Sequence, residues 1–293
     1  MVDTEAIYRA GFTAVVDAVN SVGGVIMPQL LEALGVKCIR INCEPTGQFA
    51  HNPEPLPEHL TELSSKVVKE GADLGISVDP DVDRLALICE DGNPFGEEYT
   101  LVAVADYILG HKKGTTVSNL SSSRALRDIT EAAGCEYFAS AVGEVNVVTE
   151  MKRVGAVIGG EGNGGVIVPD LHYGRDAMIG IALFLSLLAN KNIKMTELRA
   201  KYPFYYISKN KIELSPSMDV DKILEEVKHK YSSERVTDID GVKVDFDAER
   251  KWVHLRKSNT EPIIRIYAEA SSEQLASELA TNVIKVINEI IST

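Results

Sequence analysis

The stretch from Asp79 to Arg84 is the segment of this sequence best suited to chemistry. It places three carboxylates, Asp79, Asp81 and Asp83, at alternate positions and ends on an arginine. Carboxylates so close repel one another strongly unless a cation lies between them. A hard divalent cation with oxygen ligands removes that repulsion, and Mg²⁺ suits a site that a substrate phosphate completes. The residues alone therefore indicate a metal–phosphate site, with a solvated Asp-rich turn as the main alternative.

Two other aspartate-based sites fit this segment less well. An EF-hand would use the three aspartates and Glu90, but it requires a glycine where Arg84 stands and a helix on each side. The flanking runs, Leu74–Val78 and Leu85–Cys89, instead have the composition of buried strands. A haloacid-dehalogenase-type phosphatase also uses paired aspartates, but it does not require a third Asp followed directly by Arg. We therefore expect a tight loop between two strands.

Composition narrows the class of protein. The chain has 293 residues, with 30 Lys and Arg against 43 Asp and Glu, and its net charge of −13 argues against nucleic acid and anionic membranes as partners. It has no secretory leader and no apolar run of about 18 residues, so we expect neither export nor membrane insertion. The four cysteines are Cys38, Cys43, Cys89 and Cys135. Their spacing does not match a metal site, and we expect reduced, mostly buried thiols in a cytoplasmic protein, although the sequence alone leaves a disulfide open.

The expected elements divide the chain into three domains, at residues 1–93, 94–202 and 203–293. In the first two, strand-like runs alternate with helical patterns, which predicts sheets with helices packed on them. In the second domain we expect a strand over residues 156–158 that enters a Gly-rich loop at Gly159. The third domain has alternating, antiparallel-type strands with two helices, which predicts an α+β layout.

Three further motifs follow the Asp loop in order. They are Gly-Glu-Glu-Tyr-Thr at residues 96–100, Gly-Gly-Glu-Gly-Asn-Gly-Gly-Val-Ile at 159–167, and Arg-Lys-Ser-Asn-Thr-Glu-Pro-Ile-Ile-Arg at 256–265. With the Asp loop, they resemble the α-D-phosphohexomutase superfamily, which includes phosphoglucomutase, phosphomannomutase and phosphoglucosamine mutase. The resemblance covers nearly the whole chain. It implies two α/β/α mixed-sheet domains followed by a C-terminal α+β domain with a TATA-binding-protein-like fold.

The superfamily's first domain has no counterpart in these motifs. That domain carries a catalytic serine in a Thr-x-Ser-His-Asn-Pro loop. The His-Asn-Pro at residues 51–53 follows Ala50, so the serine is absent there. Ser121, Ser122 and Ser123 precede a predicted helix, where N-capping is the expected role. The chain therefore resembles a superfamily member from its second domain onward, and the resemblance implies the missing N-terminal domain as a partner.

The resemblance also implies site residues. Asp79, Asp81 and Asp83 would hold Mg²⁺, with Val82 where family members often have Gly. Arg84 would steady the phosphoryl group, and Glu144 is a candidate proton acceptor. Asn163 stands where the sugar-reading loop often has Ser. The residues expected to bind substrate are Glu161, Asn163, His172, Arg175, Arg256, Ser258, Asn259, Thr260 and Arg265.

The implied activity is the movement of a phosphoryl group between O1 and O6 of a hexose phosphate through a hexose bisphosphate. The sequence does not choose among glucosamine, mannose and glucose phosphates. We expect this chain to be inactive alone, because the phosphoserine domain is missing. Two alternatives stay open: a non-catalytic phosphosugar-binding protein, and a metal-dependent phosphatase with Asp79 or Asp81 as nucleophile.

Overall fold

The computed structural model describes residues 1–215, 218–258 and 263–292. These residues form two compact units, one of Met1–Ala139 and Gly143–Pro203, and one of Ser140–Val142 and Phe204–Thr293. We refer to them as unit 1 and unit 2. The domain boundary predicted between residues 93 and 94 lies inside unit 1, which contains two sheets, and it stays a prediction.

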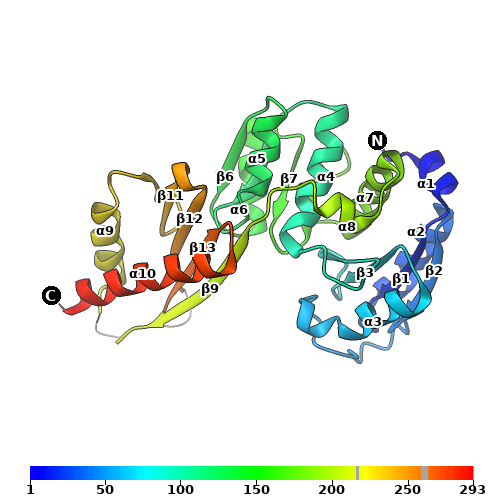
Figure 1. Ribbon diagram of the computed structural model, residues 1–293, viewed down its shortest axis with the longest axis horizontal. Coiled ribbons are helices and arrows are strands. Elements are labelled where there is room, and N and C mark those ends of the chain that lie inside the picture. Colours follow the sequence, from blue (N-terminus) through cyan, green and yellow to red (C-terminus); the bar gives the residue numbers. More distant parts are fainter. Residues whose placement is uncertain (216–217, 259–262, 293) are drawn as a thin grey trace. The chain divides into compact units, whose positions relative to one another are not determined.

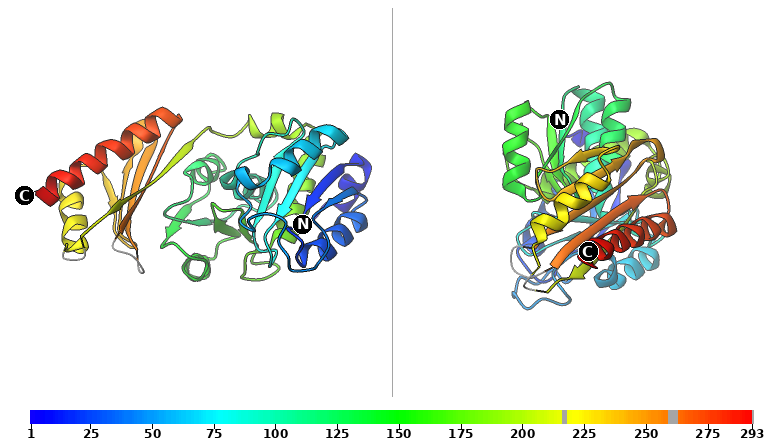
Figure 2. Two further views of the ribbon diagram at one scale, coloured as in Figure 1. Left: turned by 90° about the horizontal axis from the view of Figure 1, so that it is seen from below. Right: turned by 90° about the vertical axis from the view of Figure 1, so that its left-hand side faces the viewer.

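The first part of unit 1 is a mixed four-stranded sheet with helices on both faces. Its elements are α1 (Thr4–Ala10), β1 (Thr13–Asp17), α2 (Gly23–Ala33), β2 (Lys37–Ile41), the 3-10 helix η1 (Pro57–His59), α3 (Thr61–Glu70), β3 (Leu74–Val78) and β4 (Leu85–Cys89). The strand order is β2-β1-β3-β4; β1 is parallel to β2 and β3, and β4 is antiparallel to β3. Helices α2 and α3 lie on opposite faces of this sheet (Figures 1 and 2).

The amphipathic pattern of α3 explains its place. Leu63 and Val67, four residues apart, share one side of the helix and pack with Val15 and Ile88 of the sheet. The helix ends at Gly71, whose backbone has φ +60°, a left-handed conformation that glycine adopts at low cost. The chain then turns into β3, which leads directly to the Asp loop.

The second part of unit 1 repeats the α/β/α layout. Its elements are α4 (Glu97–His111), β5 (Thr116–Asn119), α5 (Ala125–Ala132), β6 (Tyr137–Ser140), α6 (Glu144–Val154), β7 (Ile158–Glu161), β8 (Gly165–Ile167), α7 (Ala177–Lys191) and α8 (Met195–Arg199). The strand order is β6-β5-β7-β8, with β5 parallel to β7 and β8 antiparallel to it.

The glycines of β7 show why this strand extends further than the sequence predicts. A Cβ at Gly159 would lie 2.5 Å from the sulfur of Met151 on α6, and one at Gly160 would lie 3.1 Å from Leu101 on α4. Successive strand residues face opposite sides, so α6 and α4 cover the two faces of the sheet at close range. The predicted Gly-rich loop from Gly159 was therefore wrong in part: the strand runs to Glu161, and the turn begins after it.

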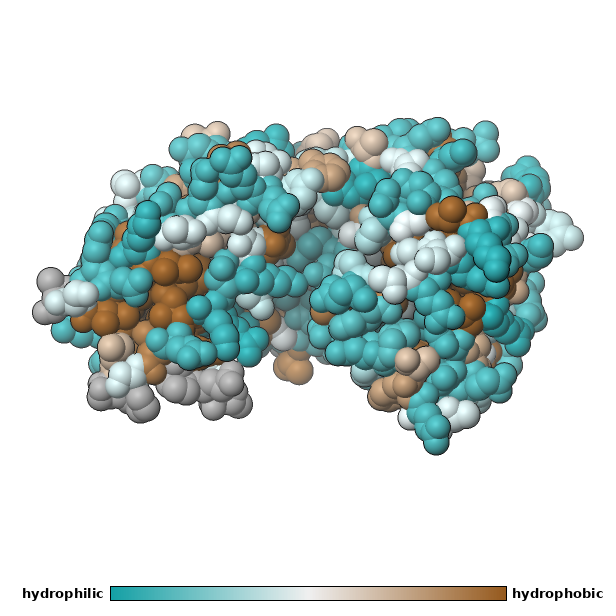
Figure 3. Space-filling view, turned by 60° about the horizontal axis from the view of Figure 1, so that its bottom comes forward, coloured by the Kyte–Doolittle hydropathy of each residue, from teal (hydrophilic) through white to brown (hydrophobic). Residues whose placement is uncertain are grey.

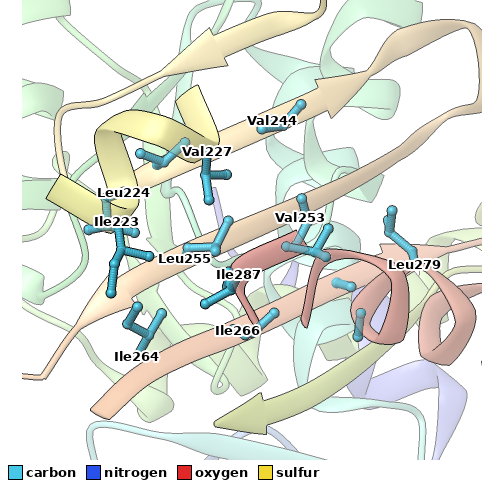
Figure 4. Packing of buried hydrophobic residues seen from close by; sticks show 14 of the residues in the cluster. Ile223, Leu224, Val227, Val244, Val253, Leu255, Ile264, Ile266, Leu279 and Ile287 are labelled. Atoms are coloured by element: carbon cyan, nitrogen blue, oxygen red, sulfur yellow. The ribbon is translucent and has the colours of Figure 1, made fainter. Parts of the chain in front are cut away.

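Unit 2 is an antiparallel sheet with two helices on one face. Its elements are β9 (Tyr206–Glu213), α9 (Val220–Lys230), β10 (Arg235–Thr237), β11 (Val242–Phe246), the 3-10 helix η2 (Asp247–Glu249), β12 (Lys251–Lys257), β13 (Ile263–Ala270) and α10 (Glu273–Ser292). The strand order is β10-β11-β12-β13-β9. Figure 4 shows the core between the helices and the sheet, with labelled residues Ile223, Leu224, Val227, Val244, Val253, Leu255, Ile264, Ile266, Leu279 and Ile287.

These two units confirm the predicted fold class, two α/β/α mixed-sheet domains and a C-terminal α+β domain. Apolar side chains at the margin of the unit 2 core are only partly buried, and Figure 3 shows an apolar patch on this unit within a mainly hydrophilic surface. Among the described helices, none combines the length and the apolar character needed to span a bilayer.

Candidate functional site

The loop between β3 and β4 is organised by its first aspartate. The Asp79 side chain is 2% exposed, and its Oδ1 accepts hydrogen bonds from the backbone N–H groups of Asp83 (3.1 Å) and Arg84 (3.0 Å). Its Oδ2 accepts a 2.6 Å bond from Arg84 Nε. Val82 takes a left-handed conformation (φ +62°) that closes the loop, although a β-branched residue adopts this conformation at some cost. The loop is thus a wound turn with its first carboxylate inside.

The three aspartates fit a divalent cation. Asp79, Asp81 and Asp83 each offer a carboxylate oxygen, and these oxygens lie within 4.8 Å of one another. The Oδ1 atom of Asp83 is buried and has no hydrogen-bond partner among the described residues, although Arg84 Nε lies 3.9 Å from it. A buried carboxylate oxygen without a donor is costly unless a cation serves it. Hard oxygen donors alone make up this set, which suits Mg²⁺.

Burial and neighbouring charges shift the pKa values of Asp79 and Asp83 in opposite directions. Burial, and then the charge of Asp79, raise the pKa of Asp83 to about 6. Burial also opposes ionisation of Asp79, but the hydrogen bonds from Arg84 outweigh it and hold the pKa of Asp79 below its ordinary value. Neighbouring carboxylates whose pKa values are separated in this way are typical of a site in which the protein supplies too little positive charge to neutralise both.

The β7–β8 hairpin presents Glu161 at its turn. This carboxylate is buried: Oε1 accepts from Asn119 Nδ2 (2.9 Å) and the N–H of Gly143 (3.2 Å), and Oε2 accepts from Arg175 Nη1 (2.9 Å). Asn163, in the turn itself, is half-buried, and its Oδ1 accepts a 3.3 Å bond from the N–H of Gly165. The hairpin therefore holds its acid rigidly rather than presenting it on a free loop.

The hairpin and the Asp loop are in direct contact. The N–H of Leu85 donates to the carbonyl of Gly164 at 3.1 Å, and Arg84 pairs with Gly165 in an antiparallel bridge. At the other end, the N–H of Ala177 donates to the carbonyl of Val82 at 3.1 Å. The structure thus brings together two motifs that are some eighty residues apart in the sequence.

Arg175 lies at the centre of this junction. Its side chain is 18% exposed and forms ion pairs with Asp83, with Glu161 at 2.9 Å, and with Glu144 at 3.4 Å. Glu144 begins α6, and its Oε1 also accepts the backbone N–H of Arg175 at 3.0 Å. His172 pairs at 3.0 Å with Asp176, the residue that caps α7, and a Cβ at Gly174 would lie 3.1 Å from His172 Nδ1 and 3.7 Å from Glu144 Oε1. Ion pairs of Arg175 thus link Asp83, Glu144 and Glu161 into one cluster.

Ser122 and Ser123 make structural hydrogen bonds, but the predicted N-capping of the helix was wrong, because the N-cap of α5 is Arg124 and no side chain caps it. Ser123 Oγ accepts the N–H of Ala125 at the start of α5, and Ser122 Oγ accepts the N–H of Gly162 at 3.0 Å. Both serines are buried. They support the helix start and the hairpin turn.

In unit 2, two predicted phosphate ligands lie on neighbouring strands. Arg256 of β12 is directly opposite Arg265 of β13, and Arg256 Nε lies 2.8 Å from Asp240 Oδ2. Ser258 follows β12, and its N–H donates to the carbonyl of Ile263 at 3.0 Å. The predicted ligands Asn259 and Thr260 lie outside the described residues. Like charges directly opposite destabilise a strand pair, so the two arginines suit a bound anion.

Sequence reasoning missed three residues of these clusters. Lys211 of β9 is directly opposite Arg265, which extends the pair to a row of three cations, Arg256, Arg265 and Lys211. Asp240 orients Arg256, and Asn119 orients Glu161. The alternation of β9 would have placed Lys211 on the face of Lys209, but only the register shows which of them pairs with Arg265.

Comparisons with known proteins give the family of the chain. Models of three phosphoglucomutase/phosphomannomutase domains match the chain: alpha/beta/alpha domain II over residues 1–92, alpha/beta/alpha domain III over 96–205, and the C-terminal domain over 210–286. A phosphoglucomutase/phosphomannomutase of Thermococcus kodakarensis is 37% identical over 292 residues, which are 98% of this chain and 63% of that protein.

Solved structures show the same fold. A phosphoglucomutase/phosphomannomutase family protein from Burkholderia thailandensis matches with a TM-score of 0.84 and 25% identity, over 98% of this chain and 63% of that one. The Aspergillus fumigatus N-acetylphosphoglucosamine mutase, solved in complex with GlcNAc-6P and magnesium, matches with a TM-score of 0.65 and 18% identity, over 98% of this chain and 64% of that one. The chain belongs to the α-D-phosphohexomutase superfamily, and it spans less than two thirds of the length of these relatives.

Proposed function

We propose that this chain forms the metal-, sugar- and phosphate-binding part of a phosphohexomutase that moves a phosphoryl group between O1 and O6 of a hexose phosphate. The observation that carries the proposal is the cluster of three carboxylates, with oxygens within 4.8 Å of one another, joined to the hairpin that holds Glu161. The relatives are mutases of hexose phosphates. The magnesium complex of the Aspergillus enzyme supports Mg²⁺ as the cation.

In this proposal the residues of the Asp loop position and neutralise the transferring group. Bound Mg²⁺ neutralises charge on the phosphoryl oxygens, which is most of what phosphoryl transfer needs from a protein. Asp79, Asp81 and Asp83 hold the cation. Arg84, fixed to Asp79 through Nε, turns its remaining N–H groups to the phosphoryl oxygens. Glu144 accepts the proton of the attacking hydroxyl, for which it must release Arg175.

The remaining predicted residues divide between the sugar and the resting phosphate. Glu161 and Asn163 contact the hydroxyls, with Arg175 and His172 beside them. Two guanidinium groups and a hydroxyl of unit 2, those of Arg256, Arg265 and Ser258, bind the phosphate that is not transferred, together with Asn259 and Thr260. Such a division suits a hexose bisphosphate intermediate that binds in two orientations. The proposal does not choose among the phosphates of glucosamine, mannose and glucose as substrates.

The phosphoryl donor in this proposal is a phosphoserine of the superfamily's first domain, acting in the cytoplasm. The matches are to the second, third and C-terminal domains, and Ala50 precedes the His-Asn-Pro of this chain. The described serines before α5 are engaged in structural hydrogen bonds. The chain by itself is therefore expected to bind hexose phosphates without converting them.

A mutase assay with Mg²⁺, a hexose bisphosphate and the 1-phosphates of glucose, mannose and glucosamine tests this. We expect binding of at least one sugar phosphate by calorimetry, no conversion by the chain alone, and conversion when a serine-bearing first domain is supplied. Conversion by the chain alone would place the nucleophile within it, and Ser121, Ser122 and Ser123 would be the first to replace. Absence of binding to every sugar phosphate would refute the proposal.

A non-catalytic phosphosugar-binding protein is the second candidate, because the sugar hairpin and arginine pair need no nucleophile to bind a ligand. It predicts the same binding, but no conversion after a serine-bearing domain is supplied. That single measurement separates the two.

A further inference from the structure

Arg175 contacts carboxylates from three separate segments of unit 1. Its guanidinium pairs with Asp83 of the Asp loop, with Glu161 of the hairpin and with Glu144 of α6. Its stem lies across Gly165, where a Cβ would come within 2.4 Å of Arg175 Cδ. The glycine therefore leaves the space through which this arginine reaches the Asp loop.

The three aspartates differ in how the protein neutralises them. Asp79 receives its donors from within the loop, two backbone N–H groups and Arg84. Asp81 is exposed to solvent. Asp83 has Arg84 Nε at 3.9 Å, and among the described residues it alone of the three takes a cation from a distant segment, since Arg175 lies 92 positions away in the chain. The positive charge on Asp83 is thus the one that can leave without unwinding the loop.

We propose that Arg175 is the internal counter-ion of this site and competes with the divalent cation for Asp83. The inference rests on the proposed function, because it takes the three aspartates as the metal ligands. A cation that binds Asp83 takes over the charge that Arg175 supplied, and Arg175 keeps Glu161 as a partner. Arg175 is then a positioning residue, whose arrangement differs between the metal-free and the metal-bound protein.

The consequence is that Arg175 lowers the affinity of the site for the divalent cation. A fixed positive charge beside a divalent cation opposes its binding, and charges a few ångströms apart near a protein surface interact strongly enough to change an affinity by about tenfold. Glu161 retains two other donors, Asn119 and the N–H of Gly143. Loss of the guanidinium therefore leaves the hairpin acid supported.

The test is a calorimetric titration of the metal-free chain with Mn²⁺ alone. We expect Arg175→Met to bind Mn²⁺ about tenfold more tightly than the wild type, and Arg175→Lys, which keeps the charge, to stay within about threefold of it. Arg153→Met is the matched control, because it removes an equal charge from an exposed arginine of α6 that pairs with Glu150. It should leave the affinity unchanged.

Each outcome bears on the inference. Unchanged or weaker binding by folded Arg175→Met overturns it while leaving the proposed function intact, and so does an equal gain in Arg175→Lys, which would indicate a steric role. A wild-type chain that binds no Mn²⁺ refutes the metal site and the inference together. If Arg175→Met does not fold, as judged by circular dichroism, Arg175→Gln replaces it, because its amide can still donate to Glu161.

Discussion

The carboxylates of the Asp loop and the cationic row of unit 2 are charged groups placed by different kinds of backbone. In the loop, the N–H groups of Asp83 and Arg84 fix Asp79, and contacts with distant segments complete the cluster. In the row, strand register alone puts Arg256, Arg265 and Lys211 side by side. The carboxylates of the loop are paired with Arg84 and Arg175, and among the described residues of the row Asp240 pairs with Arg256 and Glu213 with Lys211. The difference is the one that the proposed function requires, a loop that holds a cation and a strand surface that binds an anion.

The largest effect is expected at the exposed aspartate of the loop. Asp81→Asn should weaken Mn²⁺ or Mg²⁺ binding on the order of a hundredfold, since even residues that only support a metal ligand are worth roughly 10–100-fold. Among the described residues Asp81 makes no hydrogen bond or ion pair that holds the loop, whereas Asp79 does, so the thermal stability of the metal-free protein should not fall. Calorimetry and thermal melting measure the two quantities.

Asp170→Asn is the control for Asp81→Asn, because it removes the same charge from an exposed acid that pairs with Lys112. Equal metal affinity in the wild type and Asp81→Asn would show that the triad is not the cation site. The contrast between the two clusters would then lose its basis.

The second prediction concerns the anion site. Arg256→Met should weaken binding of glucose 1-phosphate by at least about tenfold, because a hydrogen bond to a charged group is worth about 1.5–3 kcal/mol. Arg256→Met should leave the affinity for Mn²⁺ unchanged, whereas Asp81→Asn should lower it. Calorimetric titrations with each ligand test both statements. Arg235→Met, which removes an arginine paired with Asp245 and Asp247, is the control in unit 2, and an equal loss there would deny Arg256 a specific role.

The two clusters also differ in how far they could be predicted from the sequence. The aspartates were predicted because their spacing is local, and the arginines because their motifs resemble those of the superfamily. The fold class followed from strand and helix patterns together with that resemblance. The junction at Arg175 could not be predicted, since it depends on three segments that meet only in the folded chain. The cationic row could be predicted in part. Arg256 and Arg265 belong to one motif, but the pairing of Arg265 with Lys211 depends on the register of β9 with β13.

The third prediction uses the buried histidine next to the cationic row. Burial lowers the pKa of His254 to about 3, helped by Lys243, although Nε2 donates to the carbonyl of Asp240 at 2.7 Å. The folded state therefore binds fewer protons than the unfolded state, whose histidine has its ordinary pKa near 6.5. The stability from neutral His254 is fully present above about pH 6.5 and is lost as pH falls toward about 3.

His254→Gln should remove this pH dependence, because its amide can donate to the same carbonyl without taking up a proton. From about pH 7.5 to about pH 5.5, the free energy of unfolding of the wild type should fall by about 1 kcal/mol more than that of the variant. The single tryptophan, Trp252, is buried in unit 2 and reports its urea unfolding by fluorescence. Parallel pH profiles for the two proteins would mean that the pKa of His254 is the same in the folded and the unfolded state.

The smallest effect separates register from general surface charge. Lys211 is directly opposite Arg265, whereas Lys209 is on the same strand and face but opposite Tyr267. Lys211→Met should weaken binding of glucose 1-phosphate by about twofold to threefold, the range expected of an exposed charge that also pairs with Glu213. Lys209→Met should change it less, and Lys230→Met on α9, paired with Glu289, should not change it at all. Equal losses in all three variants would indicate only a lowered net charge. A loss confined to Lys211→Met would show that the cross-strand row is what binds the phosphate, because the three substitutions differ in register and face but not in charge.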